Sequence, residues 1–141
     1  MIQLKRQSLL YAIYCSPFLF LVFLIGCGNN GNLELLQGLQ SGTDRIEIHT
    51  PGSSFSPGDN KVAVYVIRNG EFVELDEGNL WLHMPEMPNM PRMDTDTYLT
   101  KNGDRLEGNI YFEMGGGWNG EIIVQTARGQ TIDAPLRVQV R

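Results

Sequence analysis

Short runs of alternating apolar and polar residues recur along the chain from about residue 45 onward. Ile46 and Ile48 alternate with polar neighbours, whereas the run 61–68 is rich in β-branched residues and is typical of a central strand. Asn69-Gly70 is the dipeptide favoured by two-residue hairpin turns. The pattern predicts strands over these ranges: 45–49, 61–68, 71–75, 80–83, 106–114, 121–126 and 136–140.

The spacing of these runs predicts the fold class. Turn-forming residues separate them at intervals of about 8 to 12 residues, and no long helical pattern interrupts them. We therefore predict an all-β fold, an immunoglobulin-like antiparallel β-sandwich of about seven strands. Four aromatic residues are expected in its core: Tyr65, Trp81, Phe112 and Trp118.

The N-terminal segment follows a different pattern. Lys5 and Arg6 precede an almost wholly apolar stretch, and Leu24-Ile25-Gly26-Cys27 matches the lipobox of bacterial lipoproteins. Residues 1–26 are therefore predicted to be a lipoprotein signal peptide, with Cys27 as the lipidated residue. An uncleaved membrane anchor is the alternative, because about 18 apolar residues can just cross a bilayer. Both interpretations place the remainder outside the cytoplasm.

The residues after Cys27 refine this location. An aspartate directly after the lipidated cysteine is a cue for retention in the inner membrane, and Gly28-Asn29 lacks it. The expected location is the outer membrane, facing the periplasm, if the organism has two membranes. Residues 27–43 are predicted to be the lipidated cysteine and a flexible tether, and residues 44–141 the folded domain.

Composition excludes several function classes. The net charge of −5 would become −7 without Lys5 and Arg6. Nucleic-acid binding is therefore not expected, because contact with phosphates requires a basic surface. Loss of Cys15 with the leader and lipidation of Cys27 would leave no thiol for a disulfide or a thiolate metal site. With two histidines, no GxSxG motif and no phosphate-binding glycine loop, the chain is predicted not to be an enzyme.

The segment 83–93 stands apart because methionines and prolines alternate in it. Four methionines follow one another at intervals of three residues, and a proline follows each of the first three. Proline lacks an N–H and disfavours helix in the residue before it, so a helix and a central strand are excluded. A polyproline II ribbon is therefore predicted, with successive methionines about 9 Å apart along one edge.

These side chains suggest soft-metal chemistry. Thioethers suit Cu(I), and the imidazole of His83 adds a nitrogen donor. On a straight ribbon two methionines could share one ion, whereas a third ligand would need a bend or another residue, such as His83, His49 or Met114. Two other interpretations remain open, a partner-binding patch and simple packing. Asp94-Thr95-Asp96 lacks the rest of a calcium loop and is predicted to be a solvated turn.

With these motifs the sequence resembles the YtkA-like family, which is related in pattern to the FixH group, over residues 44–141. The resemblance rests on the strand Val62–Ile67 with its hairpin, on Met84-Pro85-Glu86-Met87 as a Met-Pro-x-Met element, and on Gly116-Gly117-Trp118. It implies an extracytoplasmic immunoglobulin-like sandwich linked to copper handling or oxidase maturation. The chain departs from the family pattern by having four methionines and no His-rich or Gly-Met stretch near the second.

Two functional hypotheses follow. The first is a lipid-anchored protein that sequesters Cu(I), or passes it to a copper-efflux or oxidase-assembly partner. Its predicted metal ligands are His83, Met84, Met87, Met90 and Met93. The second is a cell-envelope interaction module that binds no metal and uses the same segment as a protein-docking edge.

Overall fold

The computed structural model describes residues 32–141, so the predicted signal peptide and Cys27 lie outside the described residues. Within the described residues the chain forms nine strands and no helix. The strands are β1 (Leu33–Ser41), β2 (Asp44–Pro51), β3 (Gly58–Arg68), β4 (Glu71–Phe72), β5 (Leu75–Met84), β6 (Met93–Asn102), β7 (Arg105–Phe112), β8 (Gly116–Thr126) and β9 (Thr131–Val140). Residues 32–141 therefore contain no helix that could cross a membrane.

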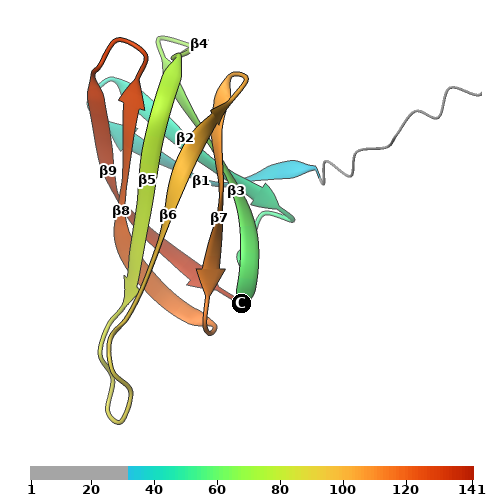
Figure 1. Cartoon of the computed structure of the whole chain (residues 1–141), viewed down its shortest axis with the longest axis vertical. Coiled ribbons are helices and arrows are strands. Elements are labelled where there is room, and N and C mark those ends of the chain that lie inside the picture. The colour runs from blue at the N-terminus through green and yellow to red at the C-terminus, as the bar shows by residue number, and fades with distance from the viewer. Residues whose placement is uncertain (1–31) are drawn as a thin grey trace, which may run out of the picture.

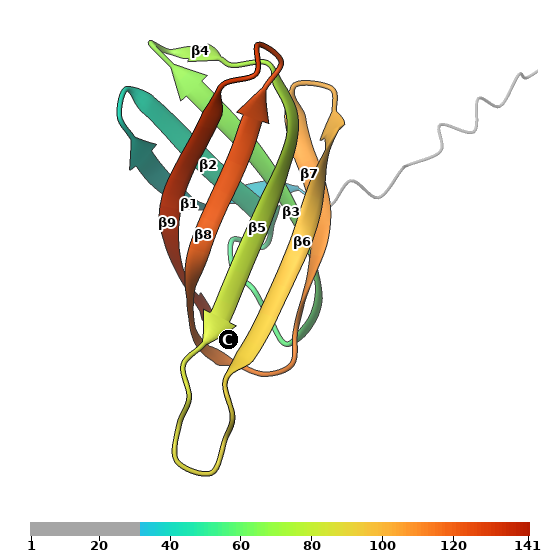
Figure 2. The same ribbon diagram turned by 60° about the vertical axis from the view of Figure 1, so that its left-hand side comes forward.

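The strands form one continuous antiparallel sheet in the order β1-β2-β3-β7-β6-β5-β8-β9, and the short β4 pairs with β3. The sheet curls until β1 comes close to β9, so that the half containing β2 and β3 faces the half containing β5 and β8 (Figure 1). Figure 2 shows the same two facing layers from another side. Apolar side chains between the layers form a single core.

The predicted all-β antiparallel class is confirmed, although the structure has nine strands instead of about seven and the sheet is almost closed. The hairpin turn at Asn69-Gly70 is also confirmed, because both residues have positive φ and Arg68 pairs with Glu71. The turn predicted at Asp94-Thr95-Asp96 is wrong. These residues belong to β6, where both carboxylates take the outward positions and alternate with threonine.

The predicted flexible tether is also wrong for residues 33–41. These residues form β1, which pairs with β2 from Leu33–Pro51 to Ser41–Asp44. Leu36 and Leu39 pack against the core, so the strand gains apolar burial as well as backbone hydrogen bonds. The folded domain therefore begins about ten residues before residue 44, since β1 begins at Leu33.

The core is built from the inward positions of alternating strands, and β9 alternates between exposed and buried positions from end to end. Phe55, Phe112 and Trp118 form a chain of aromatic contacts, with ring centroids 5.1 and 5.2 Å apart. Trp118 and Phe112 are core residues as predicted. The same prediction is wrong for Trp81 and Tyr65, which are only half-buried at outward positions of their strands.

Candidate functional site

The Met-Pro segment forms the tip of the β5–β6 hairpin, which projects beyond one end of the sheet (Figures 1 and 2). Met84 pairs with Met93 at the last position of the β5–β6 ladder. At the tip, the Met87 N–H donates to the Met90 carbonyl at 3.1 Å, and the Met90 N–H donates to the Met87 carbonyl at 2.9 Å. The four methionines therefore form two cross-strand pairs.

The predicted polyproline II ribbon is wrong, because a turn at Pro88-Asn89 folds the segment back on itself. Proline presets the φ of the first turn residue, and the φ of Asn89 is +68°, which together define a type II turn. Pro85 and Pro91 fall in the stretch between the two methionine pairs, where no ladder hydrogen bond needs their missing N–H. The bend that a multi-thioether site would require is thus present.

Met84 belongs to the core at the base of the hairpin. It is 3% exposed, whereas Met87 at the tip is 43% exposed. The methyl group of Met84 lies against Gly116, whose φ is +134°, and a Cβ built at that glycine would come within 2.8 Å of it. Gly116 therefore leaves the space that the Met84 side chain fills, which is the role expected for a glycine at a close approach.

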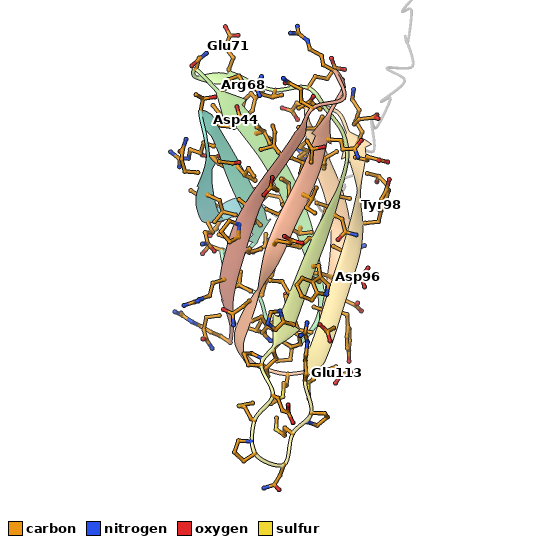
Figure 3. The ribbon with its side chains drawn as sticks, turned by 90° about the vertical axis from the view of Figure 1, so that its left-hand side faces the viewer. Asp44, Arg68, Glu71, Asp96, Tyr98 and Glu113 are labelled. Carbon is orange, nitrogen blue, oxygen red and sulfur yellow. The ribbon has the colours of Figure 1, made fainter. Side chains whose placement is uncertain are left out.

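Two further methionines, Met93 and Met114, are half-buried and pack against the same core. Met114 lies in the turn between β7 and β8, and its carbonyl accepts a hydrogen bond from the Trp118 indole at 3.4 Å. Figure 3 shows its neighbour Glu113 beside the base of the β5–β6 hairpin. The sequence spacing alone could not predict that Met114 lies near this hairpin. Its position depends on the strand order, which places β7 between β3 and β6.

His83 lies on the outer face of β5, opposite to its neighbour Met84. Its ring contacts Trp81 at a centroid distance of 5.0 Å, and the strand register places it between Asp94 and Asn119. Its Nδ1 atom is buried and has no hydrogen-bond partner within the described residues. The structure therefore does not bring His83 and Met84 to one site.

The surface around His83 is polar. The Arg92 guanidinium lies 5.4 Å from the Trp81 ring and forms an ion pair with Asp94 at 2.9 Å. Farther along β6, a hydrogen bond to Glu77 raises the pKa of the exposed Tyr98 above its usual value. Trp81 and His83 also line a groove of about 500 Å³, together with Gln37, Glu121 and Arg137.

His49 lies on β2, and three strands separate it from β5 in the sheet order. Its Nε2 is 3.2 Å from a Glu47 carboxylate oxygen, and its ring meets Tyr65 edge to face at 5.0 Å. His49 therefore does not join the hairpin methionines. Among residues 32–141, no group of three His, Cys, Asp or Glu side chains is arranged to hold a metal ion.

Comparison with known proteins identifies a family. A family model described as YtkA-like matches residues 39–123, which are more than half of the chain. The matched span runs from β1 into β8 and contains the whole β5–β6 hairpin. Comparison with curated proteins and with solved structures gives no match. The chain therefore belongs to the YtkA-like family.

Proposed function

We propose that the protein is an extracytoplasmic lipoprotein, anchored through Cys27, that binds Cu(I) through the β5–β6 hairpin. It sequesters the ion or delivers it to a copper-efflux or oxidase-assembly protein. The observation that carries this proposal is the fold of the hairpin, which pairs Met84 with Met93 and Met87 with Met90. The hairpin thereby pairs methionines that are nine and three residues apart along the sequence across its two strands.

The chemistry of the donors favours a soft monovalent ion. A thioether is neutral, requires no deprotonation and binds Cu(I) in preference to hard cations such as Ca²⁺ or Mg²⁺. It forms no disulfide in an oxidising compartment, although it can be oxidised to a sulfoxide. Because His83 points to the other face of β5, the proposal depends on the methionines more than on the histidine.

A Cu(I) competition titration tests this proposal. The full chain in mild detergent is titrated without oxygen against a coloured Cu(I) chelator, so that β1 stays paired with β2. The control variant changes Met84, Met87, Met90 and Met93 to Leu, which keeps apolar volume but removes every sulfur of the hairpin. We expect the wild type to withdraw about one equivalent of Cu(I) and the variant none. A wild type that withdraws no copper from a weak chelator contradicts the proposal.

A second candidate function is docking of a protein partner on the hairpin tip. The exposure of Met87 favours it, because flexible, exposed methionines often form adaptable contact surfaces. The same four-leucine variant separates the two functions. Crosslinking of a partner should survive the change if apolar contact alone is needed, whereas copper binding should not.

A further inference from the structure

Three methionines gather at the base of the β5–β6 hairpin, and one of them comes from outside the Met-Pro segment. We infer that Met84, Met93 and Met114, named here the base cluster, form a half-buried three-thioether site for Cu(I). This inference rests on the proposed function and assigns its ligands. It also separates these ligands from the two methionines at the tip, of which Met87 is exposed and Met90 half-buried.

The first two members face each other directly. Met84 and Met93 are register partners in the β5–β6 ladder, and register partners project their side chains to the same face of the sheet. Met84 is almost fully buried and Met93 packs against the core, so this shared face is the inner one. An ion between them would be shielded from water on the core side.

Two contacts bring the segment that contains Met114 close to this pair. On one side, the Thr95 hydroxyl donates to the Tyr111 carbonyl at 2.7 Å, which holds the start of β6 beside the end of β7. Met93 precedes Thr95 by two residues and Met114 follows Tyr111 by three, so this contact brings both methionines to the same end of the two strands. On the other side, the Met84 methyl group lies against Gly116, two residues after Met114.

The surroundings of the base cluster suit a monovalent soft ion. Phe112, two residues before Met114, and Trp118, whose indole donates to the Met114 carbonyl, are both buried in the core. Three neutral thioethers supply no negative charge, so a divalent ion would remain poorly compensated in this apolar environment, whereas Cu(I) carries a single charge. The three thioethers come from β5, from β6 and from the β7–β8 turn. They can therefore approach one ion from three directions, which the side chains of a single extended strand cannot do.

The decisive comparison uses two sets of leucine variants of the full chain. Met114→Leu removes one thioether of the base cluster and leaves the Met-Pro segment untouched. Met87→Leu combined with Met90→Leu removes both tip thioethers and serves as the matched control. We expect the first variant to weaken Cu(I) binding at least tenfold in the chelator competition. The control should change it less than about threefold, and thermal unfolding verifies that each variant is folded.

X-ray absorption at the copper edge provides a second measurement that needs no variant. We expect three sulfur ligands and no nitrogen ligand on Cu(I) bound to the wild type. A spectrum with a histidine nitrogen, or Met114→Leu binding as tightly as the wild type, overturns the base cluster while copper binding itself stands. A wild type that binds no Cu(I) overturns the proposed function and the base cluster with it.

Discussion

At the scale of single residues, Gly120 lies where the backbone of β5 leaves no room for a side chain on β8. It lies on β8 opposite Leu82 of β5 and Leu136 of β9, at an inward position. A Cβ built on this glycine would come within 1.9 Å of the Trp81 carbonyl oxygen. Backbone cannot yield as a flexible side chain does, so any larger residue must push β5 and β8 apart.

We therefore predict that Gly120→Ala lowers the free energy of unfolding by about 3 kcal/mol, as expected for severe overpacking. Urea unfolding monitored by tryptophan fluorescence measures this change. Gly117→Ala, three residues earlier on the same strand, is the control, because its nearest neighbour would be a Gln139 side-chain oxygen at 3.8 Å. Equal stability of the two variants would show that β5 and β8 lie farther apart than described.

The environment of single residues was only partly predictable from the sequence. Leu80 and Leu82 face the core, whereas Trp81 between them faces outward and packs with His83 and Arg92. Such a run is apolar on both faces, so alternation alone cannot say which face is inward. The neighbouring strands decide, and they place the buried Ile122 next to Leu80 on the inner face.

At the scale of secondary-structure elements, the turn at the hairpin tip controls how the methionines are arranged. Asn89 has a φ of +68°, a conformation that asparagine and glycine tolerate and β-branched residues disfavour. Two backbone hydrogen bonds close the tip, and both join Met87 to Met90. The conformation of this one turn residue therefore determines whether the tip stays paired.

We predict that Asn89→Val opens the hairpin tip, because a β-branched residue at positive φ costs about 1 to 3 kcal/mol. Amide hydrogen exchange of Met87 and Met90 should become faster by roughly tenfold, while the amides of β5 keep their protection. Asn89→Gly is the control and should exchange as slowly as the wild type. Unchanged exchange in the valine variant would mean that the tip is held by something other than this turn.

The same element explains why the spacing of the methionines was misinterpreted. A period of three with intervening prolines matches polyproline II, and the spacing of the methionines alone does not distinguish that ribbon from a hairpin. The deciding signal was Pro88-Asn89, a favoured pair for the central positions of a type II turn. Strand β1 was not predicted for a related reason, since its leucines gain their burial only from β2 and the core.

At the scale of the whole molecule, the sequence predicted the all-β class but not the strand order. Hairpin neighbours such as β8 and β9 follow from local turns, whereas the pairing of β3 with β7 and of β5 with β8 joins segments distant in sequence. These long-range pairings bring the turn containing Met114 to the base of the β5–β6 hairpin. Local sequence patterns therefore could not predict the base cluster as a whole, although they did single out the Met-Pro segment 83–93 that supplies two of its members.

An ion pair joins β2 to β3 at the end of the molecule away from the β5–β6 hairpin, where Figure 3 shows Asp44 and Arg68. The Arg68 guanidinium donates to both carboxylate oxygens of the buried Asp44, at 2.6 and 2.9 Å. Its third nitrogen reaches Gln130, in the turn between β8 and β9, at 3.2 Å. The pair thus links β2 and β3 in one layer to the β8–β9 turn in the other.

This ion pair predicts a pH dependence of stability. The hydrogen bonds from Arg68 hold the pKa of Asp44 below its ordinary value of 3.8. A carboxyl group whose pKa is lower in the folded state contributes stability in full above the unfolded value. That contribution is lost as the pH falls through 3.8 and on through the folded pKa. We expect Asp44→Asn to lower the unfolding free energy by about 2 kcal/mol at pH 7, as for a lost charged hydrogen bond.

Urea unfolding of the wild type and Asp44→Asn between pH 2 and 7 isolates this contribution from other acids. Burial alone would raise the pKa of Glu107, but hydrogen bonds from Asn102, Arg105 and Lys61 outweigh it and lower this pKa. Glu107 therefore also contributes less stability in acid, but this change is the same in both proteins. The difference between the two proteins should shrink below about pH 4 and vanish once Asp44 is protonated in the folded state. Asp133→Asn, at an exposed position of β9, should leave the wild-type profile unchanged. A stability difference that stays constant down to pH 2 would mean that Asp44 contributes through packing and not through its charge.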